Sequence, residues 1–395
     1  MAESVDLAAY GPGFVTDPHA VYAELRAVAP VHRVRFPPPD HEDDVYLIVG
    51  YEEARAALAD PRLVKSAAAV GVQFSDEALI GTNLLMADPP QHTRLRKLIA
   101  REFTARRVEA LRPRIQEITD GLLDEMLAAG DRADLVEALA FPLPITVICE
   151  LLGVPDMDRA AFRRMSNAVV SPPTTEVWDA TLAEIAAYLD ELIEDKRTTA
   201  AGDDLLGALI RTTAEDGDRL SARELRAMAF LLLIAGHETT VGLISHAVYA
   251  LLTHPRQLAE LRADMSLLDG AVEETLRHEG PVENATHRFT AEPVEIGGTV
   301  IPAGSAVIVG LAAADRDPHR FPAPDDFDIH RAPQGHVAFG HGIHFCLGAP
   351  LARVEGKVAI GSLLERCPQL ALDGAPPEWK PGLLMRGMRH LGVRW

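Results

Sequence analysis

Apolar residues recur every three or four positions along most of the chain, which is the spacing of helices with one buried face. The pattern is clear over 18–30, 51–61, 107–129, 267–279 and 351–366. We predict a helix over each of these ranges. The chain is therefore expected to be mainly α-helical.

The longest predicted helix starts after Ser221 and stops before Pro255. Ser221 and Glu224 have the spacing of a capping box, in which each side chain accepts from the other residue's backbone N–H. At 1.5 Å per residue this helix is about 48 Å long. It is apolar on most faces around 230–235, so we expect it to lie in the core.

Runs over 45–50, 294–310 and 390–395 alternate or are rich in β-branched residues, and they predict a small sheet with hairpins. No linker-like, repeated or low-complexity tract divides the chain, although its length allows several domains. We expect a single domain over 1–395, mainly α with a small β part, and a flexible N-terminus over 1–14.

Charge and cysteine content narrow the function classes. The chain has 38 Lys+Arg against 58 Asp+Glu and a net charge of −20, which argues against a nucleic-acid partner. Its three cysteines are an odd number, and its first residues lack a basic region followed by an apolar run. The longest apolar run, 227–236, is too short to span a bilayer. We expect a cytoplasmic protein with reduced thiols and no membrane partner.

One segment, 94–114, runs against the overall acidity, with eight Arg and Lys residues against two Glu. Such a segment is either a solvated helix face or a docking patch for a small acidic protein. The pattern alone does not decide between them.

A short stretch, 339–353, places His341, His344 and Cys346 among glycines. Structural zinc sites use four ligands, usually in two spaced pairs, and no second pair of that type is present. A cysteine nucleophile would need a base and an orienting group, which the sequence does not exclude. The C-x-x-C-H haem attachment pattern is absent.

A thiolate ligand to haem iron suits this stretch better. Gly340, Gly342 and Gly348 let the backbone pass close to a flat macrocycle. The helix that begins near Ala349 aims its free N–H groups and its positive dipole end at the sulfur of Cys346. These groups would stabilise a thiolate and tune its donation to iron.

The central helix carries the run AGHETT, which resembles the zinc-protease pattern H-E-x-x-H except that Val241 replaces the second His. Glu238 is costly to bury without a role. Thr239 can bond back to the carbonyl of Ala235. The run is either a satisfied polar spot in a core helix or a proton relay beside a site that Ala235 and Gly236 leave open.

Two further pairs are weak signals alone. Glu274 and Arg277 lie three apart on one helix, which makes an ordinary ion pair. His92 and Arg96 lie four apart, and two donors on one helix face can grip a carboxylate.

Together these four stretches resemble the cytochrome P-450 haem-thiolate monooxygenases, in order and spacing from about Val15 to Trp395. The Cys-loop pattern F-G-x-G-x-H-x-C-x-G is met by Phe339, Gly340, Gly342, His344, Cys346 and Gly348. The central-helix pattern A-G-x-[DE]-T is met by Ala235, Gly236, Glu238 and Thr239. The E-x-x-R pair is Glu274 and Arg277, and the loop 315–331 resembles the one that adds a third member, here Arg331.

The resemblance implies the cytochrome P-450 fold, with haem b between the central helix and the Cys-loop helix. It implies that Cys346 is the axial iron ligand, and that Glu238 and Thr239 deliver protons to bound dioxygen. The haem propionates would be held by His92, Arg96, Arg288 and His344. Other haem contacts would be Phe339, Gly340, Ala235 and Gly236.

Within the family the chain most resembles actinomycete hydroxylases that tailor macrolides and related polyketides. The implied reaction is hydroxylation or epoxidation of a large apolar substrate with O2 and two electrons. Steroids, flavonoids, terpenoids and xenobiotics are alternative substrates, and a peroxide-using enzyme, a haem sensor or a haem-free Cys346 hydrolase is an alternative function. No flavin, iron–sulfur or dinucleotide-binding module is recognisable, so a ferredoxin and its reductase would deliver the electrons, which favours 94–114 as the docking patch.

By the same resemblance, the substrate pocket would draw on the loop 70–86, on 230–238, on 282–286 and on the segment near residue 384. Candidate contacts are Met86, Leu233, Ile234, Val282, Ala285 and Leu384. Asp76 and Glu77 are either partners of an amino-sugar cation or, more commonly for such residues, solvated loop carboxylates.

Overall fold

The computed structural model describes residues 4–37, 44–66, 80–101, 103–154, 159–170, 174–198, 204–211, 219–331 and 335–395. The helices are α1 (Pro12–Thr16), α2 (Pro18–Val28), α3 (Tyr51–Ala59), α5 (Gln91–Ala100), α6 (Ala105–Ala129), α7 (Pro142–Leu152), α8 (Arg159–Val170), α9 (Thr175–Thr198), α10 (Leu205–Arg211), α11 (Ala222–Thr253), α12 (Pro255–Ala263), α13 (Leu268–His278), α14 (Leu311–Ala314) and α15 (Ala349–Arg366). The strands are β1 (Val5–Asp6), β2 (Val31–Arg35), β3 (Val45–Ile48), β4 (Leu63–Val64), β5 (Arg132–Asp134), β6 (Arg288–Thr290), β7 (Val294–Ile296), β8 (Thr299–Ile301), β9 (Ala306–Val309), β10 (Ala371–Leu372) and β11 (Gly392–Arg394). The predicted mainly α architecture is confirmed.

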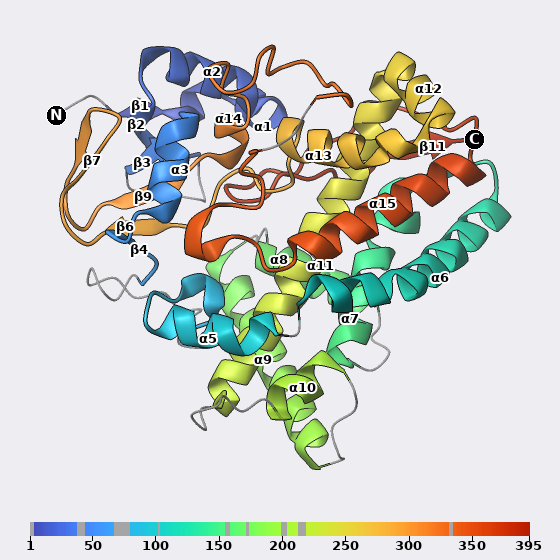
Figure 1. Cartoon of the computed structure of the whole chain (residues 1–395), viewed down its shortest axis with the longest axis horizontal. Coiled ribbons are helices and arrows are strands. Elements are labelled where there is room, and N and C mark those ends of the chain that lie inside the picture. Colours follow the sequence, from blue (N-terminus) through green and yellow to red (C-terminus); the bar gives the residue numbers. More distant parts are fainter. Residues whose placement is uncertain are drawn as a thin grey trace.

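Helix α11 runs through the middle of the molecule, and α6 and α15 lie side by side across it from the main sheet (Figure 1). Ser221 caps it, and both halves of the predicted capping box with Glu224 are present. Helices α7, α9, α13 and α15 all pack against α11. By length and composition α11 would be apolar enough to cross a membrane, but 61% of its most apolar window is buried inside the protein, as in a core helix.

The main sheet places two basic residues next to each other. Its strand order is β1-β2-β3-β9-β6-β4. Strand β4 pairs antiparallel with β6, with Val64 opposite Phe289, so Lys65 directly after β4 lies beside Arg288 at the start of β6. Two smaller sheets, β10-β11-β5 and β7-β8, complete the β part.

The described part of the segment 1–14, which we predict to be flexible, packs against α2 and the sheet. Val5 pairs with Val34 of β2 in parallel, and Leu7 is fully buried. The ring of Phe14 meets that of Tyr22 edge-on, with centroids 5.8 Å apart. These apolar side chains fix the described part of the segment because they are covered by α2 and the sheet.

The Cys loop needs glycine at two positions. Gly340 and Gly342 have φ of 72° and 73°, a region that L-residues with a side chain rarely adopt. A Cβ at Gly342 would lie 2.9 Å from the backbone oxygen of Leu58, so glycine also allows the loop to approach the end of α3. The loop is thus held against the sheet side of the molecule.

Candidate active site

Cys346 sits at the end of a tight loop just before α15. Its N–H donates to the carbonyl of Phe339 at 2.9 Å, which closes the loop. The backbone N–H groups of Gly348 and Ala349 hydrogen-bond to the sulfur, as expected for the N-terminal end of a helix. Burial nevertheless raises the pKa of Cys346, although these bonds and the charges of Arg96 and Arg353 oppose the rise.

A protonated thiol at this position is a poor nucleophile, which argues against the hydrolase alternative. A bound metal cation would supply the missing stabilisation of the thiolate.

A zinc site made by Cys346 with the neighbouring histidines is not the arrangement found. Among the described residues, the His, Cys, Asp and Glu side chains close enough to share an ion are Asp134, Glu137 and His390, and Cys346 is not in that group.

Part of the protein interior is open beside Cys346. Cys346 is accessible even though the surrounding protein desolvates it, so it borders a space that side chains do not fill. Ala235 is also accessible although it lies midway along the mostly buried α11. One turn later, the hydroxyl of Thr239 donates to the carbonyl of Ala235 at 2.9 Å, as predicted. The small side chain of Ala235 leaves this face of α11 uncovered.

The four residues expected at the propionates lie in one cationic cluster. The rings of His92 and His344 are 4.4 Å apart. Arg96 donates to the carbonyls of Ile343 and Phe345 at 2.9 and 2.8 Å, which ties α5 to the Cys loop. His92 and Arg288 are buried, yet Nε2 of His92 and Nε of Arg288 have no hydrogen-bond partner.

Lys65 is a further member of this cluster that sequence reasoning missed. Its ammonium donates to the carbonyls of Thr286 and His287 at 2.8 and 3.1 Å. Burial and the charge of Arg288 hold its pKa well below the usual range. A lysine after a two-residue strand carries no sequence signal of burial; only the β4–β6 pairing reveals it.

The cluster has more positive charge than the protein neutralises. Burial lowers the pKa of Arg288 to about 10. Burial, with the charges of Lys65, Arg288, His92 and Arg96, lowers that of His344 to about 2. Asp88 partly offsets the charge, but its oxygens already accept the backbone N–H groups of residues 65 and 66. Buried unpartnered donors and uncompensated cations fit a ligand with two carboxylates, as haem has.

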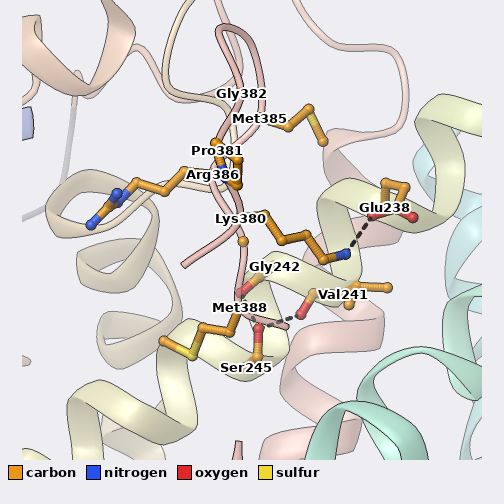
Figure 2. Close-up of a pocket in the computed structure, with 11 residues that line it drawn as sticks. Glu238, Val241, Gly242, Ser245, Lys380, Pro381, Gly382, Met385, Arg386 and Met388 are labelled. Carbon is orange, nitrogen blue, oxygen red and sulfur yellow. Dashed lines mark hydrogen bonds and ion pairs between the residues drawn. The ribbon is translucent and has the colours of Figure 1, made fainter. Parts of the chain in front are cut away.

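Glu238 lies on α11 next to Thr239 and is 9% exposed. Ser166 of α8 donates to its Oε1 at 3.0 Å, and Lys380 lies 4.0 Å from its Oε2. Burial raises the pKa of Glu238, but the hydrogen bond and charge of His237, with Lys380 and Ser166, outweigh burial and hold the pKa at about 2. Figure 2 shows the Lys380 ammonium directed at this carboxylate.

Glu274, Arg277 and Arg331 lie together as the resemblance implies. Glu274 accepts from Arg277 Nη2 at 2.7 Å and Nε at 2.8 Å, and from Arg331 Nε at 3.1 Å. The side chains of Glu274 and Arg277 are fully buried. Arg277 also donates to three backbone carbonyls of the loop 315–326, so the network fixes that loop.

The expected substrate contacts divide into two groups. Partly buried side chains are those of Met86, Ile234, Val282, Ala285 and Leu384. Leu233 is 1% exposed and belongs to the main hydrophobic core, and its contact with substrate stays a prediction. The expected pairing residues Asp76 and Glu77 lie outside the described residues.

Gly236 has a packing contact that the sequence did not predict. A Cβ there would lie 2.9 Å from the side chain of Ile148 on α7. Glycine at this position therefore allows α7 and α11 to pack closely, and it is Ala235 that leaves the site open.

Several cations of 94–114 are not free for a partner. Arg112 pairs with Glu109, and Arg114 pairs with Glu117 and Glu150. Arg94 pairs with Glu224. Exposed cations of the segment include Lys97, Arg101 and Arg106. The Cys loop, which Arg96 of this segment contacts, exposes 48% of Ile343 and 42% of Phe345.

Comparison with known proteins places this site in a family. The cytochrome P450 family model matches residues 155–386. The chain is 59% identical to cytochrome P450 monooxygenase PikC of Streptomyces venezuelae, over 99% of this chain and 94% of that protein. It is 48% identical to 6-deoxyerythronolide B hydroxylase of Saccharopolyspora erythraea, over 96% of each. The structure of the tirandamycin C-bound P450 monooxygenase TamI superposes with a TM-score of 0.91 at 45% identity over 99% of both chains. With its Cys loop, open central helix and buried cations, the chain belongs to the cytochrome P450 monooxygenases.

Proposed function

We propose that this protein holds haem b with Cys346 as the axial ligand and oxidises a large, mostly apolar secondary metabolite of the macrolide or related polyketide class. The observation that carries the haem site is an accessible but desolvated thiol beside a largely buried cationic cluster whose charge the protein does not neutralise. Family membership implies a haem-iron cofactor. When bound, the haem iron supplies dioxygen activation by two electrons and two protons.

The residues of the chain have three tasks in this reaction. His92, Arg96, Arg288 and His344 would bind the propionates, and Lys65 would add positive charge behind them. Gly348 and Ala349 would orient and stabilise the thiolate through their N–H groups. Glu238 and Thr239 would pass protons toward the open face of α11.

The substrate class is supported by two relatives whose names state their substrates or ligands. One is the 6-deoxyerythronolide B hydroxylase and the other is TamI with tirandamycin C. A spectral binding screen tests the class directly, with macrolactones, glycosylated macrolides, steroids, terpenoids and flavonoids read by the spin-state shift of the haem. We expect macrolides to give the tightest spectral dissociation constants. Tighter binding of a steroid or flavonoid would contradict the assignment.

Electrons would come from a ferredoxin and its reductase. The exposed cations Lys97, Arg101 and Arg106 suit a small acidic partner, and Arg96 joins their segment to the Cys loop with its exposed Ile343 and Phe345. We also propose that the protein works in the cytoplasm, where its free cysteines stay reduced.

The peroxide-using alternative makes a different prediction for Thr239. A monooxygenase that reduces dioxygen needs the hydroxyl at this position, so Thr239→Ala should divert electrons from product to hydrogen peroxide. A peroxide-driven enzyme would not need it. Product per electron is measured with ferredoxin, reductase and NAD(P)H, and unchanged coupling in the variant would favour the alternative.

A further inference from the structure

Three side chains form a buried chain of hydrogen bonds beside the site. Ser166 Oγ lies 2.8 Å from His237 Nε2 and 3.0 Å from Glu238 Oε1. Ser166 belongs to α8, whereas the other two belong to α11. Ser166 and His237 are fully buried. The carboxylate of Glu238 is therefore joined to two groups that solvent does not reach directly.

The number of protons in this chain follows from its donors and acceptors. His237 Nδ1 lies 2.7 Å from the carbonyl oxygen of Leu233, which only accepts, so Nδ1 carries a proton. The hydroxyl of Ser166 has one proton and can donate to only one neighbour at a time. Both of its contacts are satisfied only when His237 and Glu238 together hold one further proton.

That proton can occupy either of two positions. In one state His237 is charged, its Nε2–H donates to Ser166, and Ser166 donates to the Glu238 carboxylate. In the other state protonated Glu238 donates to Ser166, and Ser166 donates to neutral His237. Transfer of the Nε2 proton to Ser166 Oγ, with transfer of the hydroxyl proton to Glu238 Oε1, converts the first state into the second. One N–H and one O–H bond break and two O–H bonds form, so no proton is gained or lost.

Glu238 needs such a source. His237, Ser166 and Lys380 hold this carboxyl ionised despite its burial, with a pKa of about 2. An ionised carboxylate has no proton to give to Thr239. Besides Lys380, 4.0 Å from the carboxylate, His237 is an adjacent group that can carry one, and Phe141 encloses one side of its ring.

We propose that His237 and Ser166 form a proton relay that protonates Glu238 from the side of α8. The proposal deepens the function proposed above, since it rests on Glu238 as the proton-delivering acid. His237 and Ser166 are positioning residues, because they act through Glu238. The relay also explains why a hydroxyl on α8 is directed at the central helix.

Between turnovers solvent can return a proton to Glu238 from its opposite side, and the reverse transfer through Ser166 then recharges His237. A cavity of about 30 Å³ borders Glu238, Gly242, Lys380 and Met385, which is enough for a water molecule, since one needs about 10–15 Å³. Lys380, whose side chain is 24% exposed, lines this cavity together with Glu238 (Figure 2). The titratable groups that face Glu238 are thus His237 on α11 and Lys380 on the C-terminal segment.

The first test counts the protons on His237 and Glu238 by NMR, in the absence of turnover. The reduced, carbon monoxide-bound holoenzyme is labelled with 15N-histidine and 13C-glutamate. The resonances of the two residues are assigned by their loss in His237→Gln and Glu238→Gln. We expect one shared proton at neutral pH, either as a doubly protonated His237 with an ionised Glu238 or as the reverse. A neutral His237 beside an ionised Glu238 would overturn the proposal.

The second test removes the bridging hydroxyl. Ser166→Ala should lower product per electron by about tenfold, less than the 100- to 10,000-fold typical of a direct proton donor, and raise peroxide release. Ser166→Thr keeps a hydroxyl and should restore most of the coupling. Thr119→Val is the matched control, because Thr119 is buried and its hydroxyl donates only within α6, to Ile115 at 2.8 Å.

The outcomes separate this relay from the function on which it rests. Full coupling in Ser166→Ala, with uncoupling in Glu238→Gln, would overturn the relay and leave the proposed function standing. Full coupling in both variants would overturn the role of Glu238 as well. Equal loss in Ser166→Ala and Ser166→Thr, with an intact carbon monoxide spectrum, would show a packing effect and reject the relay.

Discussion

Glu274→Gln should destabilise the protein strongly, because it leaves two cations around a buried site without a counter-charge. Glu274 holds Arg277 through two bonds of 2.7 and 2.8 Å, and it holds Arg331 through one of 3.1 Å. It also accepts the backbone N–H of Asp328 at 3.0 Å. An amide offers a single acceptor oxygen, and its NH2 group would face a guanidinium that also only donates.

The size of the effect follows from burial. Removing one partner of a fully buried ion pair costs about 3–5 kcal/mol. For 395 residues, an unfolding entropy of about 2.1 cal/mol/K per residue amounts to about 0.8 kcal/mol/K. The melting temperature should therefore fall by about 4–6 °C.

The assay is thermal unfolding by circular dichroism, with Glu109→Gln as the matched control. Glu109 is also the acidic partner of an arginine three residues away in a helix, Arg112, but both side chains are exposed. Its replacement should shift the melting temperature by about 1 °C or less. A drop in Glu274→Gln no larger than that of the control would refute the assignment of a buried, stabilising network.

Three further predictions concern other parts of the molecule. Burial raises the pKa of Glu355 to about 8, so the fold loses stability as pH rises through that value. The urea midpoint of the unchanged protein should therefore fall between pH 6 and pH 9, and Glu355→Gln should fall less. An equal fall in the two proteins would contradict this. Lys65→Met removes a charge-assisted contact near the propionates, so the haem should transfer to excess apomyoglobin about tenfold faster. An unchanged rate would place Lys65 outside the haem site. The double variant Arg101→Glu and Arg106→Glu should be reduced more slowly by ferredoxin, with a rate less sensitive to salt. The control Arg256→Glu, on α12 and 92% exposed at its side chain, should be reduced at the normal rate. Equal rates in the unchanged protein, the double variant and the control would reject this docking surface.

The sequence predicted the elements that depend on local patterns. The capping box of Ser221 and Glu224 sets the start of α11, and the bond from Thr239 to Ala235 needs only helical spacing. The Cys loop was recognisable because its glycines, histidine and cysteine lie within ten residues. These features are encoded by neighbours in the chain.

The features that sequence reasoning missed join residues far apart in the chain. Lys65 lies beside Arg288 only because β4 pairs with β6. Ser166 reaches His237 and Glu238 only because α8 packs near α11. No spacing rule relates such positions.

Helix orientation explains two features of the central helix that the sequence did not predict. Gly236 and Leu233 share the apolar run with Ala235, but they face α7 and the core. The helix is apolar on nearly all sides, so hydrophobic periodicity does not say which face is open. The accessibility of Ala235 identifies that face.

The central claim is that Cys346 ligates haem iron as a thiolate. The most direct measurement is the carbon monoxide difference spectrum of the reduced protein, taken beside that of Cys346→Ser. We predict a strongly red-shifted Soret band in the unchanged protein and its loss in the variant. A band at the position typical of histidine-ligated haem in the unchanged protein, or a red-shifted band that survives in Cys346→Ser, would contradict the claim.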